Sequence, residues 1–384
     1  VRLYFRKWLV HPVKRRFAKY YLWYLQTFKG TLVIGITGSA GKTTTKEMLA
    51  SILSQKGETV YSFANIDPVY NIPTTILKCT PNTKYVILEM GVEYPGEMEF
   101  YLWLAKPDVG VITNVYQTHT VFFGDIEGVA REKGILVKNL DKSATAVLNY
   151  DNIHTLKIGG NLNSNVVWFG KNSCAPGLGS TYASSSNSRI TPSLTNKFTL
   201  NLGKDKINVQ LPIVGSQFEA NALAAAATAE VCGATLQEIK SGLEAFKSTD
   251  HRMKPIRHKS GALILDDSYN SNPSAAKEAL QTLSEVAGKK ITYVVLGDML
   301  ELGETEVQRH GELGKLASEM GVKYLVGVGP LSKYTVEGFK GETSWVSTPE
   351  EALPLLKPLL KKNSVLLIKG SRGIGLERLV ALLA

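Results

Sequence analysis

The segment GITGSAGKTTT, residues Gly35–Thr45, decides how this chain folds. The apolar run Thr31–Thr37 that leads into it predicts a buried strand, and a helix is expected to begin at Gly41. Glycines between a strand and a helix let backbone N–H groups converge on phosphate oxygens, and the helix N-terminus adds the positive end of its dipole. The segment therefore predicts a loop that binds the phosphates of ATP or a similar nucleotide.

Several side chains of this loop are expected to contact the nucleotide. Lys42 can reach the β- and γ-phosphates, and the Thr43 hydroxyl can ligate Mg²⁺. Further phosphate contacts are expected from Gly38, Ser39, Gly41 and Thr44. The loop by itself indicates nothing about the second substrate.

Outward from the loop, short apolar runs alternate with helical stretches, which is typical of an α/β fold with a largely parallel sheet. Further strands are predicted at Tyr85–Met90, Val109–Thr113 and Ala144–Leu148, and a helix is expected near Ile126. Residues 161–197 are rich in Ser, Asn and Gly, so we expect surface loop around short antiparallel strands there, before a helix at Asn221–Val231.

A second α/β segment follows. Its predicted strands are Ala262–Leu265, Ile291–Leu296, Tyr324–Val328 and Ser364–Lys369. We therefore expect a basic aromatic helical segment (residues 1–29), a central P-loop ATPase domain with a parallel sheet (30–248) and a C-terminal Rossmann-like α/β domain (249–384).

The positive charge of the chain is concentrated at its N-terminus. Residues 1–46 hold ten of the 44 basic residues and none of the 34 acidic ones, so the charges of the remaining chain balance. A nucleic-acid-binding domain would need a basic face on its folded body, and we expect no nucleic-acid partner. The three cysteines, Cys79, Cys174 and Cys232, form no CxxC pair, which fits a reducing cytoplasm.

Residues 1–29 also carry nine aromatic residues among their cations. Their longest uncharged stretch, Tyr20–Phe28, is too short to cross a bilayer, and Pro12 is expected to divide two short helices. One interpretation is contact with an anionic membrane at the inner face of the cell. The other is a helix whose aromatic face docks on the first domain while its cations stay solvated.

Polar side chains follow two predicted strands beside the phosphate loop. Glu89 ends the run that begins at Tyr85, and Asn114 and His119 follow the next strand. Each has an ordinary alternative, a solvated acid for Glu89 and a loop histidine for His119. Because strand ends of a parallel sheet meet at one edge, the set predicts a Mg²⁺ site.

Together, the motifs resemble the muramyl ligase (Mur ligase) family. The similar strings cover about residues 31–384 and are Gly38–Thr44, Leu88–Gly91, Pro95–Glu97, Thr113–His119, Ala130–Gly134, Asn221–Ala225, His251–Met253, Asp266–Pro273, Leu296–Gly303 and Lys369–Gly373. Tyr-Asn-Ser-Asn-Pro (269–273) and Gly-Asp-Met-Leu-Glu-Leu-Gly (297–303) most resemble the branch that adds D-alanyl-D-alanine.

The resemblance implies definite roles. Lys42, Lys133, His119 and Arg252 would be catalytic, and Thr43, Glu89, His119 and Lys133 would hold Mg²⁺, Lys133 as a carbamate formed with CO₂. Asn221 would contact the adenine, Arg252 the γ-phosphate, and Asp267 and Tyr269 the nucleoside side. Lys369, Ser371 and Arg372 would lie near the incoming amine.

The implied activity is an ADP-forming ligase that converts a carboxylate to an acyl-phosphate and joins it to an amine. The implied substrates are a cell-wall peptide precursor and an amino acid or dipeptide, with a monomeric enzyme in the cytoplasm. Only residues 1–29 precede the first predicted strand, so we expect the UDP-binding domain of that branch to be absent. The acceptor therefore stays open between a UDP-linked, a lipid-linked, a pseudomurein and a folylpolyglutamate type, and a non-catalytic nucleotide-binding subunit is a further alternative.

Overall fold

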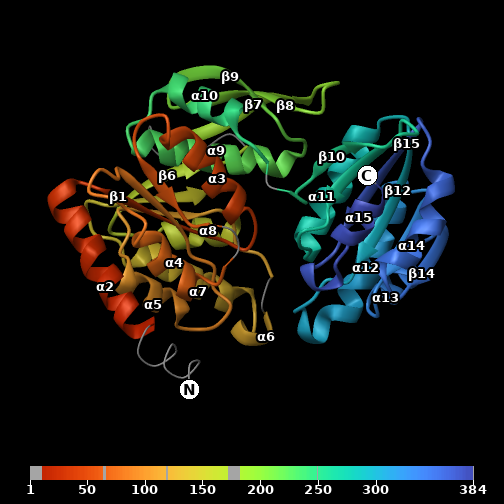
Figure 1. Ribbon diagram of the computed structural model, residues 1–384, viewed down its shortest axis with the longest axis horizontal. Helices are drawn as coiled ribbons and strands as arrows, with labels where there is room; N and C mark the ends of the chain where they lie inside the picture. Colours follow the sequence, from red (N-terminus) through yellow and green to blue (C-terminus); the bar gives the residue numbers. More distant parts are fainter. Residues whose placement is uncertain (1–10, 64–65, 118–119, 172–181, 249, 384) are drawn as a thin grey trace. The chain divides into compact units, whose positions relative to one another are not determined.

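The computed structural model describes residues 11–63, 66–117, 120–171, 182–248 and 250–383 (Figure 1). The chain divides into two compact units. The first contains residues up to Ser188 together with 197–211 and 218–246. The second contains residues 189–196, 212–217 and 247–384, so two short segments from the middle of the chain belong to the second unit.

The first unit is built on a sheet ordered β2-β3-β1-β4-β5-β6-β7-β8-β9. Its strands are β1 Leu32–Thr37, β2 Thr59–Tyr61, β3 Tyr85–Glu89, β4 Val109–Ile112, β5 Thr145–Asn149, β6 Asn165–Phe169, β7 Tyr182–Ile190, β8 Asn196–Leu202 and β9 Asp205–Leu211. Neighbours from β2 to β7 pair in parallel. Only Gly203 and Lys204 separate β8 from β9, which is a hairpin connection. The expected α/β class with a parallel-dominated sheet is confirmed.

The prediction for residues 161–197 was partly wrong. The segment contributes β6 and β7, and β6 pairs in parallel with both β5 and β7. The apolar run in β6 is buried at Val167, Trp168 and Phe169. The abundance of Ser and Asn in β7 indicated a loop, but those residues fit a strand because β7 lies largely exposed beyond β6.

Helices cover this sheet. They are α2 His11–Tyr24, α3 Lys42–Leu53, α4 Pro68–Ile76, α5 Glu97–Leu104, α6 Thr120–Phe123, α7 Ile126–Lys138, α8 Ile153–Gly159, α9 Ser216–Val231 and α10 Leu236–Ala245, with a π-helical turn η2 at Leu25–Lys29. Pro12 lies in the first turn of α2, where its missing N–H is not needed. The first of the two helices expected around Pro12 lies outside the described residues.

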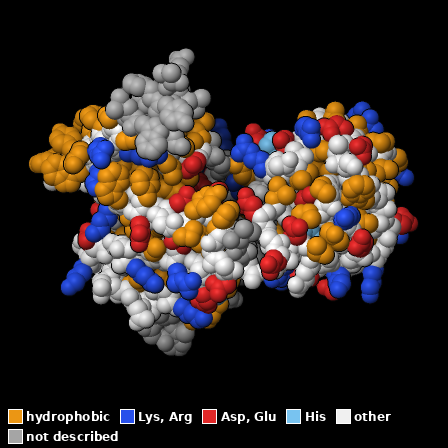
Figure 2. Space-filling view, turned by 90° about the horizontal axis from the view of Figure 1, so that it is seen from below, with side chains coloured by type: hydrophobic (Ala, Val, Ile, Leu, Met, Phe, Trp, Pro, Cys, Tyr) orange, Lys and Arg blue, Asp and Glu red, His pale blue; other side chains and the backbone are white. Residues whose placement is uncertain are grey.

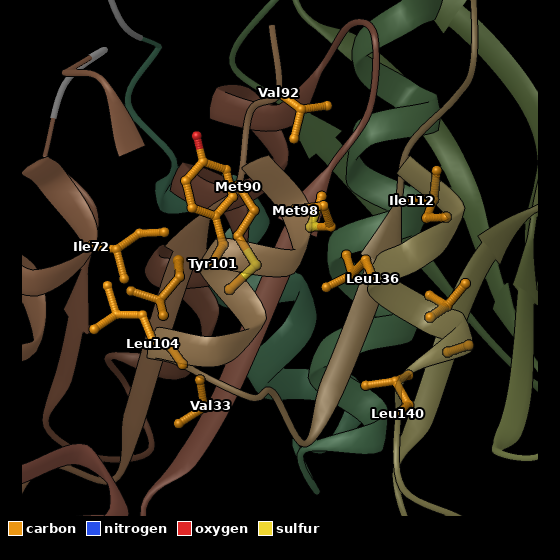
Figure 3. Packing of buried hydrophobic residues seen from close by; sticks show 14 of the residues in the cluster. Val33, Ile72, Met90, Val92, Met98, Tyr101, Leu104, Ile112, Leu136 and Leu140 are labelled. Carbon is orange, nitrogen blue, oxygen red and sulfur yellow. The ribbon is translucent and has the colours of Figure 1, made fainter. Parts of the chain in front are cut away.

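The main core of the first unit lies between its strands and helices α5 and α7. Figure 3 shows Met98 and Tyr101 of α5 and Leu136 of α7 among strand residues such as Val33 and Ile112. All five side chains are fully buried. This packing fixes the ends of β1, β3 and β4, where the candidate site residues follow.

The second unit has a sheet ordered β10-β11-β15-β12-β13-β14. Its strands are β10 Lys254–Arg257, β11 Leu263–Asp267, β12 Ile291–Gly297, β13 Tyr324–Val328, β14 Glu342–Val346 and β15 Ser364–Lys369. Only the edge strand β10 pairs antiparallel. The helices are α11 Pro273–Ala287, α12 Glu306–Glu319, α13 Ser332–Gly338, α14 Pro349–Leu356 and α15 Glu377–Leu383, and 3₁₀ turns lie at η3 Gly303–Thr305, η4 Lys357–Leu359 and η5 Arg372–Ile374.

The four strands predicted for this unit are present, whereas β10 and β14 were not predicted. Both are short edge strands with little apolar sequence. Within the described part of the chain, no helix has both the length and the apolar character that crossing a bilayer requires.

A buried histidine makes the second unit sensitive to acid. His310 of α12 is fully buried, and its Nε2 accepts the Met299 N–H at 2.9 Å while its Nδ1 donates to the Glu306 carbonyl at 2.7 Å. Burial lowers the pKa of His310 from the ordinary value of 6.5. The unfolded chain therefore takes up this proton before the folded chain does, and stability is lost as the pH falls below about 6.5.

Glutamine cannot take up this proton. We therefore expect the free energy of unfolding of His310→Gln to fall less steeply with decreasing pH than that of the wild type, by up to about 1.4 kcal/mol per pH unit. Urea unfolding of both proteins between about pH 7.5 and 5.5 measures the difference. Asp298 and Glu306, the acidic neighbours of His310, are present in both proteins. Two parallel pH profiles would show that His310 does not cause the acid sensitivity.

Candidate active site

The loop between β1 and α3 has a backbone that strongly favours glycine at two positions. Gly38 has φ +149° and Gly41 has φ +80°. A Cβ at Gly38 would lie 1.9 Å from Oγ1 of Thr113, and one at Gly41 would lie 2.2 Å from Oδ1 of Asn221. These glycines let the loop turn sharply into the N-terminus of α3, where free N–H groups can meet an anion.

The end of β4 holds this loop in place. The Ala40 N–H donates to Oδ1 of Asn114 at 2.8 Å, and Oγ1 of Thr113 donates to the Ala40 carbonyl at 2.6 Å. Oγ of Ser39 donates to the Tyr116 carbonyl at 3.0 Å and accepts from the Tyr116 N–H at 2.9 Å. The loop therefore has its shape before any nucleotide binds.

The side chain of Lys42 lies over the predicted phosphate loop. Its Nζ donates to the Gly38 carbonyl at 2.7 Å. The ammonium group is thus positioned at the concave side of the loop, near the backbone that would surround the phosphates.

A hydroxyl and a carboxylate meet beside the loop, as expected for a metal site. Oγ1 of Thr43 donates to Oε1 of Glu89 at 3.0 Å, because the register of β1 and β3 pairs Ile36 with Glu89 and places that carboxylate next to the start of α3. Oxygen ligands of this kind suit Mg²⁺. The predicted ligand His119 lies outside the described residues.

A buried lysine faces this carboxylate. Lys46 of α3 is fully buried, and its Nζ lies 3.4 Å from Oε2 of Glu89 and 3.3 Å from Oε1 of Glu47. Neither Nζ of Lys46 nor Oε2 of Glu89 has a hydrogen-bond partner among the described residues. The pair is therefore held by charge alone, and Oε2 of Glu89 keeps a lone pair for a metal ion.

Lys133 of α7 is also buried, with 1% of its surface exposed. Burial and then the nearby Lys42 ammonium lower the pKa of Lys133 well below its ordinary value. A lowered pKa favours the neutral amine, which is a nucleophile, over the ammonium, which is not. Glu132 accepts the N–H groups of Gly96 and Met98 at 3.1 and 3.0 Å, so α7 also anchors the start of α5.

In the second unit, the end of β11 holds a strained turn. His251 and Met253 have φ +62° and +48°. Nδ1 of His251 lies 2.8 Å from Oδ2 of Asp266, and the Met253 N–H donates to Oδ1 of Asp267 at 3.1 Å. These contacts fix the residue between them, Arg252.

Arg252 and Arg372 both lie against Tyr269. Their guanidinium carbons are 4.3 and 5.5 Å from its ring centroid, and Nη1 of Arg372 donates to the Tyr269 hydroxyl at 3.2 Å. Lys369 forms an ion pair with Asp267 at 2.6 Å. Two guanidinium groups on one ring make a positively charged site that suits an anionic substrate group.

The structure thus gathers the predicted site residues into two groups. Gly38, Ser39, Gly41, Lys42, Thr43, Thr44, Glu89, Lys133 and Asn221 belong to the first unit, and Arg252, Asp267, Tyr269, Lys369, Ser371 and Arg372 to the second. The supporting residues Lys46, Glu132 and His251 were not predicted. Lys46 follows Thr43 by three residues on one helix, so its proximity to Glu89 could have been expected from helical spacing.

Known proteins match most of this chain. Residues 36–229 match the model of the Mur ligase middle domain, and residues 251–372 match that of the Mur ligase glutamate ligase domain. The UDP-N-acetylmuramoyl-tripeptide–D-alanyl-D-alanine ligase of Escherichia coli is 34% identical over 350 residues, which are 91% of this chain and 76% of that protein.

Solved structures are similar as well. A crystal structure of MurF from Acinetobacter baumannii has a TM-score of 0.87 at 29% identity, covering 97% of this chain and 80% of that one. MurF ligase from Thermotoga maritima in complex with ADP has a TM-score of 0.86 at 25% identity, covering 97% and 83%.

The charge pair at Glu89 can be tested. We expect Lys46→Met to lower stability, toward the lower end of the about 3–5 kcal/mol seen when a buried pair is broken, because Glu89 is 13% exposed. If Glu89 holds Mg²⁺, Mg²⁺ added with ADP should then raise the melting temperature of the variant more than that of the wild type, since the metal ion would replace the lost cation at Glu89.

Differential scanning fluorimetry measures both shifts. The control is Lys56→Met, which removes a partly exposed lysine paired with Glu238 at 3.8 Å and should change little. An equal Mg²⁺-dependent shift in wild type and Lys46→Met would exclude Glu89 from the metal site.

Proposed function

Because this chain belongs to the Mur ligase family and is an ATP-dependent ligase, we propose that it adds D-alanyl-D-alanine, or a closely similar dipeptide, to the peptide carboxylate of a cell-wall precursor. The observation that carries the proposal is the phosphate loop with Thr43, Glu89 and the buried Lys133 beside it. The E. coli relative, named as the ligase for UDP-N-acetylmuramoyl-tripeptide and D-alanyl-D-alanine, supports this choice of substrates.

The proposed reaction has two steps. A carboxylate oxygen of the precursor attacks the γ-phosphorus of ATP, the bond from that phosphorus to the bridging oxygen breaks, and ADP leaves. The dipeptide amine then attacks the acyl carbon, the amide bond forms, and phosphate and a proton are released. Activation is needed because a free carboxylate is a poor acylating agent.

The residues of this chain would act mainly by positioning and by neutralising charge. The loop N–H groups and Lys42 would hold the phosphates, and Arg252 would neutralise the γ-phosphate as it is transferred. Asn221, whose side chain lies against Gly41, would contact the adenine side, and Asp267 and Tyr269 the nucleoside.

Mg²⁺ is proposed as the metal, because the oxygens of Thr43 and Glu89 fit a hard divalent cation. It would neutralise charge on the transferred phosphoryl oxygens. His119 and carbamylated Lys133 are proposed as further ligands. In the carbamate, the nitrogen of the neutral Lys133 amine would bond to the carbon of CO₂ and lose a proton, which would place a negative charge beside Lys42.

The proposed setting is the cytoplasm, with a monomeric enzyme of two domains, residues 30–248 for ATP and 249–384 for closure on the substrates. The buried, free thiols of Cys79 and Cys232 fit a reducing compartment. Desolvation raises the pKa of each of these thiols to about 12, so neither is a candidate nucleophile.

Ligation is tested directly by mass spectrometry. Incubation with ATP, Mg²⁺, UDP-N-acetylmuramoyl-tripeptide and D-alanyl-D-alanine should give one product with the mass of both substrates less one water, and one ADP per product. Product with a lipid-linked, pseudomurein or folyl acceptor only would change the substrate and keep the chemistry. No ADP release with any acceptor and amine would contradict the ligase proposal.

The carbamate has its own test. We expect Lys133→Ala to lower the ligation rate by about 10²-fold or more, in the range seen when one electrostatic group is lost from an active site. With ¹³C-labelled bicarbonate, the wild type should show a carbamate carbon signal in NMR that the variant lacks. Lys138→Ala, on the exposed end of the same helix, is the control and should keep both rate and signal. A normal rate in Lys133→Ala would refute the assignment.

A further inference from the structure

Helix α2 is fixed to the first unit by one of its faces. Ala18, Leu22 and Leu25 are buried in the core of that unit. Three polar contacts hold the same side: Nζ of Lys14 to Oγ1 of Thr74 at 2.8 Å, the Tyr21 hydroxyl to the Cys79 carbonyl at 2.9 Å, and Nε2 of Gln26 to Oδ2 of Asp108 at 3.1 Å. The helix therefore presents its other face in a defined orientation.

That other face is also apolar. Val13, Phe17, Tyr20, Trp23 and Phe28 are each between 57% and 66% exposed, and Tyr24 is 38% exposed. Their spacing of three to four residues places them in one stripe along the helix. A helix on a protein surface normally shows polar residues to water, so this stripe is a hydrophobic surface that remains exposed among the residues the structure describes.

The stripe extends onto α5 and is bordered by cations. Trp103 of α5 is 44% exposed, and Nζ of Lys19 lies 4.3 Å from the centroid of its ring. Lys14, Arg15, Arg16, Lys19 and Lys29 lie along the segment, and no acidic residue occurs in the chain before Glu47. Figure 2 shows hydrophobic side chains beside Lys and Arg on the side of the first unit where Figure 1 places α2.

We propose that this face, defined as Val13, Arg16, Phe17, Tyr20, Trp23, Tyr24, Phe28 and Lys29 and called the α2 face, binds the surface of an anionic lipid bilayer. The segment His11–Lys29 would lie flat, with its aromatic rings among the headgroups and upper acyl chains and its cations at the lipid phosphates. The proposal goes beyond the ligase function and does not depend on it.

Charge and composition favour a bilayer over a protein as the occupant. Trp and Tyr prefer the interface between lipid and water, because their rings are apolar and their N–H or O–H groups need a polar partner. Protein interfaces are depleted in lysine, and a second copy of this chain would bring the same positive charge against it. A surface of one charge sign with exposed rings fits an anionic membrane.

Vesicle flotation of the full chain tests the proposal. We expect binding to vesicles of phosphatidylcholine and phosphatidylglycerol at a ratio of about 7:3, weaker binding at about 0.5 M salt, and little binding to phosphatidylcholine alone, as attraction of basic residues to anionic lipid requires. Arg16→Glu with Lys29→Glu should lower the partition coefficient at least tenfold. Phe17→Ser with Trp23→Ser should lower it by a similar factor.

Matched controls change the same properties elsewhere. Lys361→Glu with Lys362→Glu alters the net charge equally on exposed residues of the second unit, and Val307→Ser with Leu382→Ser removes exposed apolar side chains there. Both controls should float like the wild type, and all variants should keep their melting temperature and ligation rate. Loss of binding in the Lys361/Lys362 variant would show that net charge and not the α2 face causes it, which would overturn the proposal.

A spectroscopic readout separates insertion from loose adsorption. The difference in fluorescence between the wild type and Trp23→Phe gives the emission of Trp23. This emission should shift to shorter wavelength with anionic vesicles and be quenched by brominated lipid. Unshifted emission would contradict insertion of the α2 face. Concentration-dependent dimerisation without lipid, abolished by Phe17→Ser with Trp23→Ser, would assign the face to a second copy and overturn the proposal.

Discussion

The rest of the site depends on the hydrogen bonds between the end of strand β4 and the loop that joins β1 to α3. Gly38 and Gly41 allow the turn, but a glycine-rich turn alone would sample many conformations. The hydrogen bonds that Ala40 forms with Thr113 and Asn114 restrict the loop to one conformation. This fixed loop sets the position of Lys42, the start of α3 and the contact between Thr43 and Glu89. The loss of conformational entropy that ordering a phosphate site requires therefore occurs on folding and not on nucleotide binding.

Buried charge is the second constraint on the first unit. Lys46 and Lys133 are both almost fully buried, which ordinarily disfavours the charged form of a lysine. Lys46 faces the carboxylates of Glu47 and Glu89, whereas burial and then the nearby Lys42 ammonium lower the pKa of Lys133. Lys46 thus has two carboxylate partners, and Lys133 has a lowered pKa that favours its neutral, nucleophilic form. The carbamate proposed at Lys133 would give such an arrangement a purpose that stability alone does not.

Burial also positions helix α2. Burial of Ala18, Leu22 and Leu25 explains why the helix docks, but not why the opposite face carries exposed aromatic rings. The interpretation that the aromatic face of residues 1–29 docks on the first domain was therefore wrong about the face, because Phe17, Tyr20, Trp23 and Phe28 are exposed and the opposite face docks. The structure shows docking of α2 on the first unit, and the surface that remains exposed is the one proposed to meet lipid.

The sequence by itself determined the α/β class, most of the strands, the phosphate loop and the family, because these depend on local patterns such as apolar runs, glycines between a strand and a helix, and short motifs in order. It could not determine that β6 and β7 extend the parallel sheet, since strand pairing depends on neighbours distant in the chain. Only the tertiary structure showed that Lys46 faces Glu89, that Lys133 is buried beside Lys42, and that α2 is apolar on its exposed face. Burial and charge proximity are properties of the packed chain, and they set whether a lysine is an ordinary surface cation, a counter-ion or a nucleophile.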